Sequence, residues 1–146
     1  MVDPLRFRAL LDRLGTEIVA LRRLSRRDAA ELLADEDVLA AIKYRFVVAI
    51  EACIAAGRHL VAAGGLRTPR DYADVFTVLG EAGMLPARLV SDLREIARFR
   101  NLLVHGYAAV EDDRVVQILH TRLDDLEKVR AALAAAAGRG GPEPAR

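Results

Sequence analysis

The stretch from residue 100 to residue 107, which reads RNLLVHGY, holds the side chains best suited to chemistry on a phosphate. Arg100 carries a permanent positive charge on a fork of N–H groups that fits phosphate oxygens. His105, five positions later, titrates near neutral pH and can both accept and donate a proton. Tyr107 follows two residues after the histidine. Arg100 and His105 are therefore the first candidates for catalysis.

The same three residues have an ordinary structural interpretation as well. A helical arginine often joins two helices through a salt bridge, and a histidine is often satisfied inside a core. A tyrosine often packs its ring while its hydroxyl stays in water. On spacing alone, the structural interpretation is favoured for Arg100 and His105, and a packing role is favoured for Tyr107.

Helical geometry places Arg100 and His105 on different faces of one segment. At about 100° per residue, Arg100 lies near the middle of the apolar stripe, where an unpaired guanidinium is costly. It therefore needs a carboxylate, a phosphate or a wet cleft. His105 shares another face with Arg98 and Asn101, and lies about 140° around the helix from the Arg100 side chain. Either the helix unwinds near Gly106, or a second protomer supplies part of the site.

Length and composition favour a single helical domain. The chain has 146 residues, of which 53% are hydrophobic and 5% aromatic, and Ala and Leu, both good helix formers, dominate. Its formal net charge is only +1, so no broad basic surface announces a nucleic-acid-binding protein. Any contact with RNA must come from a local arrangement of residues.

Several classes of protein find no support in the sequence. The single cysteine, Cys53, lies in an apolar run and is expected to be a small core residue. Residues 1–15 lack the apolar core of a signal peptide, and charges interrupt the apolar segment 46–63, so we expect a cytoplasmic protein without a membrane span. The three histidines lack metal-ligand spacing, and no glycine-rich phosphate loop is present. We therefore expect neither a metal nor a cofactor.

Helix signals predict an all-α antiparallel four-helix bundle with an additional short helix. The predicted domain covers residues 1–137, and the Gly- and Pro-rich residues 138–146 are predicted to be a disordered tail. Asp3 and Pro4 begin the first helix, Ser25 is expected to begin the short one, and Asp112 or Asp113 is expected to cap the last. The predicted long helices span about 3–24, 37–63, 86–106 and 112–137, a shorter helix spans about 68–83, and a short helical segment begins at 25.

The spacing of Arg100, His105 and Tyr107 resembles the R-x4-H-x-Y motif of HepT-like proteins, a branch of the HEPN superfamily. The register assigns the arginine of the motif to Arg100 and not to Arg98, because a polar residue follows Arg100. The resemblance extends to the segments on either side of the motif, which cover residues 49–60, 68–86 and 98–119.

This resemblance implies a HEPN-like bundle that acts as the toxin of a toxin–antitoxin pair. It implies a metal-independent endoribonuclease whose two protomers face one cleft in a homodimer. Arg100 and His105 would be catalytic, acting on the 2′-hydroxyl and the scissile phosphate of RNA, and Asn101 would support them. The expected partner is a minimal nucleotidyltransferase antitoxin, which would neutralise the toxin by transferring AMP from ATP onto Tyr107.

Two alternatives stay open beside the nuclease. The chain could be a non-catalytic helical dimer that binds a nucleotidyltransferase or RNA, or a scaffold whose function is dimerisation. Glu51, which interrupts an apolar helix, could be the carboxylate that positions Arg100. An ordinary interhelical pair or a dimer contact is the favoured role for Glu51.

Overall fold

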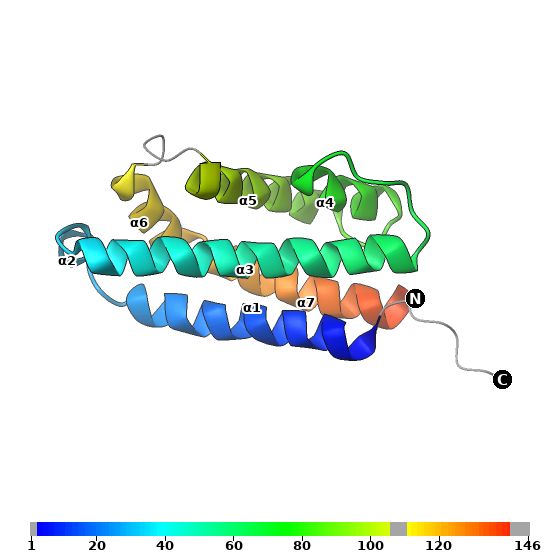
Figure 1. Cartoon of the computed structure of the whole chain (residues 1–146), viewed down its shortest axis with the longest axis horizontal. Coiled ribbons are helices and arrows are strands. Elements are labelled where there is room, and N and C mark those ends of the chain that lie inside the picture. The colour runs from blue at the N-terminus through cyan, green and yellow to red at the C-terminus, as the bar shows by residue number, and fades with distance from the viewer. Residues whose placement is uncertain (1–2, 106–110, 141–146) are drawn as a thin grey trace.

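The computed structural model describes residues 3–105 and 111–140, and all regular secondary structure within them is helical. Four long helices run roughly along the long axis of the molecule (Figure 1). Three short helices join them. In chain order, the helices of the described chain are α1 (Pro4–Leu24), α2 (Ala29–Leu33), α3 (Glu36–Ala63), α4 (Tyr72–Glu81), α5 (Ala87–His105), α6 (Asp112–Thr121) and α7 (Leu123–Gly140).

The long helices α1, α3, α5 and α7 form an antiparallel bundle, which confirms the predicted fold class. Helix α3 lies at its centre and contacts every other helix. Helix α4 packs between α3 and α5, whereas α2 and α6 contact each other at the end away from the start of α1. Helix α2 corresponds to the predicted short helix and α4 to the predicted helix at 68–83, whereas α6 was predicted as part of the last helix.

Aspartate side chains begin the first four helices. Asp3, Asp28, Asp35 and Asp71 each stand at the N-cap, and each accepts a hydrogen bond from backbone N–H groups of the first turn. Such caps satisfy donors that the helix itself leaves unpaired. The predicted start of the short helix at Ser25 is wrong, because Ser25 is the C-cap of α1 and its hydroxyl donates back to that helix.

The predicted last helix is two helices, α6 and α7, with a break at Arg122. The Arg122 guanidinium donates to Asp125 (Nε–Oδ2 2.5 Å), and Asp124 and Asp125 occupy the first turn of α7. Acidic residues stabilise the N-terminus of a helix. Asp124 and Asp125 therefore indicate the start of α7, which the prediction of a single last helix did not take into account. Helix α6 begins after Glu111, not after a capping Asp112 or Asp113.

Helix α7 also extends beyond the predicted domain boundary. It remains helical to Gly140, so residues 138–140 do not belong to a disordered tail. The rest of the predicted tail, residues 141–146, lies outside the described residues.

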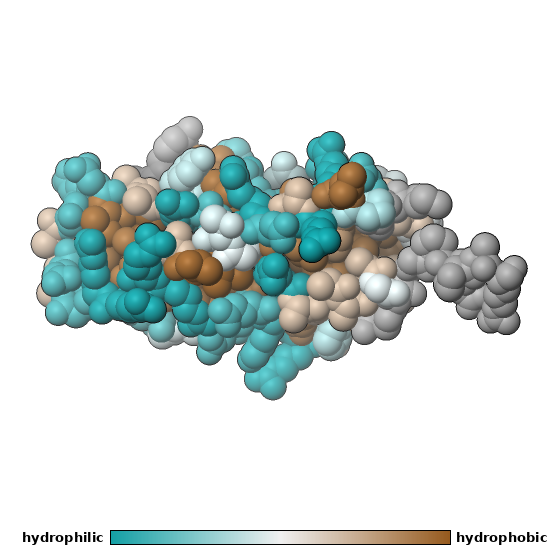
Figure 2. All heavy atoms as spheres, turned by 90° about the horizontal axis from the view of Figure 1, so that it is seen from below, coloured by the Kyte–Doolittle hydropathy of each residue, from teal (hydrophilic) through white to brown (hydrophobic). Residues whose placement is uncertain are grey.

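The core follows the apolar stripes of the helices. Its largest fully buried side chains include Phe46, Phe76 and Leu93, from α3, α4 and α5. Cys53 is also fully buried, as predicted, and burial raises the pKa of its thiol to about 12. Hydrophilic side chains cover most of the face seen in Figure 2. No helix in the described ranges has both the length and the apolar character required to cross a membrane.

Candidate functional site

Arg100 is buried at the junction of α3, α4 and α5, with an exposed fraction of 9%. Its Nη2 donates to Glu51 Oε1 on α3 at 2.7 Å, and its Nη1 donates to Asn101 Oδ1 at 3.2 Å. The guanidinium carbon lies 4.9 Å from the centre of the Tyr72 ring, which α4 contributes. The burial predicted from the apolar stripe is confirmed. We call Arg100 with Glu51, Tyr72 and Asn101 the Arg100 site.

The Arg100 guanidinium is incompletely satisfied. An arginine has five N–H donors, and only two of them donate to residues of the described chain. Its Nε is buried and has no hydrogen-bond partner there. Buried polar groups are nearly always paired, so an unpaired one calls for an explanation such as a missing ligand. The chemistry of the free donors fits an anion with several oxygens, such as a phosphate.

His105 is the last residue of α5, and its side chain is exposed. Helix α5 stays α-helical up to this residue, so the separation of about 140° from Arg100 persists. The predicted unwinding near Gly106 falls outside the described residues. Within the described chain Arg100 is recessed and held by Glu51 and Asn101, whereas the His105 side chain is exposed. Gly106 and Tyr107 lie outside the described residues.

Of the residues that contact Arg100, Glu51 was a candidate from the sequence and Tyr72 was not. The Glu51 ion pair is present. A role in positioning Arg100 and an ordinary interhelical pair both include this contact, so it does not choose between them, and the dimer contact stays a prediction. Tyr72 was missed, because nothing local in the sequence links it to a residue on α5. The only signal was its position directly after the N-cap Asp71, which fixes it to the start of α4.

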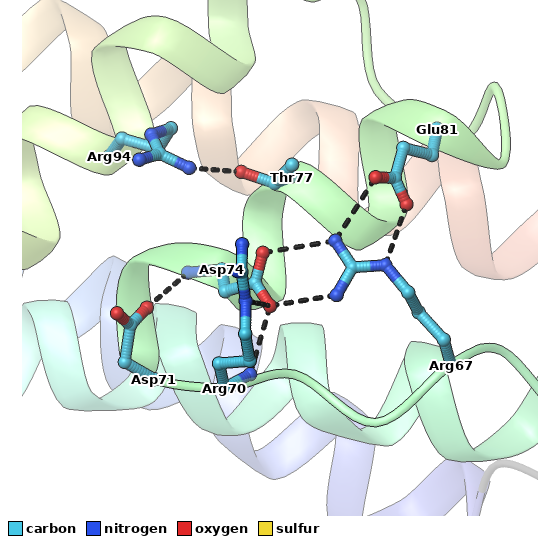
Figure 3. A network of polar contacts seen from close by, with 7 residues as sticks. All are labelled: Arg67, Arg70, Asp71, Asp74, Thr77, Glu81 and Arg94. Atoms are coloured by element: carbon cyan, nitrogen blue, oxygen red, sulfur yellow. Dashed lines mark hydrogen bonds and ion pairs between the residues drawn. The ribbon is translucent and has the colours of Figure 1, made fainter.

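A second charged cluster lies at the start of α4 (Figure 3). Arg67 donates to both oxygens of Asp74 (Nη1–Oδ2 2.8 Å, Nη2–Oδ1 3.0 Å) and to both oxygens of Glu81. The backbone N–H of Arg70 adds a bond of 2.9 Å to Asp74 Oδ2. We call these four residues the Asp74 cluster. All three Arg67 guanidinium nitrogens are paired, and the Asp74 side chain is buried.

Hydrogen bonding shifts the titration of this cluster. The Arg67 hydrogen bonds, with the backbone N–H of Arg70, hold the pKa of the Asp74 carboxyl well below its ordinary value. The same guanidinium lowers the pKa of Glu81, and the two carboxylates raise that of Arg67. Both carboxylates therefore stay ionised at neutral pH. A closed, fully paired network of this kind fixes the chain between α3 and α4.

Metal-ligating residues do not gather in the described part of the chain. Among residues 3–105 and 111–140, no group of three or more His, Cys, Asp or Glu side chains is arranged to hold a metal ion.

The antiparallel bundle, with arginine and histidine five positions apart at the end of one helix, defines the protein as a HEPN-like helical domain. The family model described as Ribonuclease HepT-like matches residues 14–133. The chain therefore belongs to the HepT-like family.

Individual relatives agree with this family. The chain is 31% identical over 78 residues to the mRNA nuclease HepT of Shewanella oneidensis, a match covering 53% of this chain and 59% of that protein. The chain is thus matched to less than two thirds of the length of this curated relative.

Solved structures share the fold over nearly the whole chain. The tri-AMPylated HEPN toxin of Shewanella oneidensis, in complex with MNT antitoxin, superposes with a TM-score of 0.82 at 22% identity and covers 92% of this chain and 99% of its own. YutE, a cytosolic protein of unknown function from Bacillus subtilis, superposes with a TM-score of 0.80 at 16% identity, covering 98% and 96%. At these identities the likeness concerns the fold.

Proposed function

We propose that the protein is a metal-independent endoribonuclease toxin, active as a homodimer and neutralised when a nucleotidyltransferase antitoxin adenylylates Tyr107. Membership of the HepT-like family supports this function. So do the mRNA nuclease among its relatives and the AMPylated toxin with its MNT antitoxin among its structural neighbours. The observation that carries the proposal is the buried Arg100, whose Nε has no described partner.

In the proposed reaction, the ribose 2′-hydroxyl attacks the adjacent phosphorus and the bond to the 5′-oxygen breaks. The products are a 2′,3′-cyclic phosphate and a 5′-hydroxyl, so no water or oxidant is consumed. One proton leaves the 2′-oxygen and one reaches the departing 5′-oxygen. His105 is exposed and has no hydrogen bond or ion pair within the described chain, which leaves it free for these transfers.

Arg100 would bind the phosphate oxygens and stabilise the charge that builds on them. Because Arg100 and His105 diverge on one helix, the site needs the two protomers of a dimer, each offering its motif helix to a common cleft. Asn101 accepts from Arg100 and stands one helical turn before His105, where it would help to orient the imidazole.

Adenylylation of Tyr107 would stop this reaction by electrostatics and bulk. The added AMP carries a negative phosphodiester two residues from His105, which repels RNA from the cleft.

The ion pair between Arg100 and Glu51 favours the second candidate, a non-catalytic dimer that binds a nucleotidyltransferase or RNA. With an exposed fraction of 9% and an ion pair to Glu51, Arg100 also fits a structural role. One experiment separates the two functions. The chain is expressed alone, beside its His105→Ala variant, and growth and cleavage of purified RNA in EDTA are compared. The nuclease predicts arrest and cleavage by the wild type only; equal results from both proteins remove His105 from catalysis.

A parallel experiment tests the neutralisation. Incubation with ATP and the antitoxin should add AMP to the wild type and not to Tyr107→Phe, as measured by intact mass. Modification that persists in the variant would exclude Tyr107 as the sole acceptor.

A further inference from the structure

A pocket of about 540 Å³ lies between α5 and α6, on the side of α5 that faces away from the Glu51 ion pair. We call it the α5–α6 pocket. By helical geometry its five α5 residues lie on average about 120° around the helix from Arg100. The residues that matter here are Arg98, Phe99 and Leu102 on α5, and Arg114 and Ile118 on α6.

Some of the charged side chains that line the pocket are paired with each other, and others are unpaired. Arg122 and Glu95 pair with each other (Nη2–Oε2 3.3 Å), so that part of the wall is neutralised. Arg98 and Arg114 are exposed, and neither guanidinium forms a hydrogen bond or ion pair within the described chain. With Glu111 at the rim, the lining has three arginines and two glutamates, and its unpaired arginines favour an anion.

The uncharged part of the pocket lining is apolar. Leu102 is 46% exposed, which is unusual for a large aliphatic side chain on a bundle helix. Phe99 and Ile118 are half-buried beside it, and the Phe99 ring is fixed edge-on against Phe46 with centroids 5.4 Å apart. A flat, partly apolar ligand group can pack here while its anionic part meets the arginines.

The pocket is also aligned with His105. Arg98 precedes His105 by seven residues, so the two lie nearly on one line along α5, two turns or about 10 Å apart. A single RNA strand bound along this line would place a base in the pocket about one or two nucleotides from a phosphate at His105. Base packing on apolar surface combined with arginine contacts to the backbone is how proteins bind single strands.

We propose that the α5–α6 pocket is a substrate subsite, which binds one nucleotide of a single-stranded RNA beside the cleavage point. The base packs on Phe99, Leu102 and Ile118, and Arg98 and Arg114 contact the flanking phosphates. This inference rests on the proposed function for its substrate, but it adds a binding site on a face of α5 that the Arg100 site does not use.

The test measures binding and cleavage separately. In a His105→Ala background, which leaves RNA intact, the dissociation constant for a short single-stranded RNA is measured by fluorescence anisotropy at several salt concentrations. Arg98→Gln and Arg114→Gln should each weaken binding about tenfold and lower the salt slope by about one, as expected for one lost phosphate contact. The matched control is Arg88→Gln, an exposed arginine on α5 outside the pocket, which should change binding less than twofold.

Base packing has its own test. Leu102→Ser should weaken binding of the intact RNA about threefold, and should have no effect on an RNA that carries an abasic residue at the pocket position. The same loss with every abasic position would overturn base packing as the role of this leucine.

The outcomes distinguish failure of the subsite from failure of the nuclease. If the wild type cleaves RNA and the pocket variants bind and cleave as Arg88→Gln does, the subsite is wrong and the nuclease stands. If the wild type does not cleave, the binding series still decides the subsite. An unchanged salt slope in both the Arg98→Gln and the Arg114→Gln variant would likewise overturn the subsite.

Discussion

The Arg100 site and the Asp74 cluster both place charged groups in the protein interior, and both use α4, yet their hydrogen bonding differs. In the Asp74 cluster every guanidinium nitrogen of Arg67 meets a carboxylate. In the Arg100 site a single carboxylate and one amide meet the guanidinium, and Nε has no described partner. Full pairing is what a structural network requires, whereas free donors are what a binding group requires.

The two regions are also connected. Asp74 and Tyr72 are two residues apart on the first turn of α4. The paired Asp74 fixes this turn to the preceding loop, and the same turn presents the Tyr72 ring to Arg100. The structural cluster therefore holds part of the candidate site in place.

The largest expected effect comes from removing the free donors. Arg100→Ala should lower the rate of RNA cleavage by about 10²–10³, the usual loss for one electrostatic group. The melting temperature should change little, because the Glu51 side chain left behind is 49% exposed and can be hydrated. Cleavage assays and thermal unfolding of the same preparation measure both. A stable, fully active variant would make Arg100 an ordinary structural residue.

Breaking the Asp74 cluster should have the opposite effect: it should lower stability and leave the rate of RNA cleavage nearly unchanged. Asp74→Asn leaves Arg67 and Arg70 with a neutral partner, and should lower the melting temperature by about 5 °C or more. Cleavage measured well below the melting temperature should stay within twofold of wild type. A loss of activity with an unchanged melting temperature would contradict the division between the two regions.

Tyr72 tests how the Arg100 guanidinium is held. A cation over an aromatic ring gains about 1 kcal/mol, so Tyr72→Leu should lower kcat about fivefold with little change in KM. Tyr72→Phe keeps the ring and should behave as wild type. If the leucine and phenylalanine variants lose activity equally, the hydroxyl and not the ring is what matters.

Glu51 gives a smaller effect. Glu51→Gln retains a hydrogen-bond acceptor for Arg100 Nη2 and removes the charge, so kcat should fall about threefold. Unchanged activity and stability would assign Glu51 to an ordinary interhelical pair. An increase in activity would mean that the carboxylate masks Arg100.

The smallest expected effect is on the pH dependence of the melting temperature. The folded-state pKa values of Asp74 and Glu81 are lowered by Arg67. Their stabilisation is therefore complete above the ordinary carboxylate range, near pH 4, and is lost as the pH falls toward the lowered values. Melting temperatures between pH 7 and pH 3 should fall less steeply for Asp74→Asn than for wild type. Parallel curves would show that the cluster does not contribute to acid sensitivity.

Much of the fold was predictable because its signals are local. Apolar periodicity predicted the long helices, with Asp3 as the cap of α1, and the same periodicity predicted that Arg100 is buried. The errors came where two local signals overlapped: Ser25 precedes the true cap Asp28, and the Asp124–Asp125 start of α7 directly follows α6.

The sequence by itself determined an all-α bundle, its HepT-like family and the candidates Arg100, Asn101, His105 and Tyr107, because periodicity and motif spacing act within one or two helical turns. Only the tertiary structure decided the partners of Arg100. Glu51 is 49 positions away from it and Tyr72 lies on another helix, so their meeting depends on how α3, α4 and α5 pack. The α5–α6 pocket arises in the same way, since its two unpaired arginines line one pocket only once the helices are assembled.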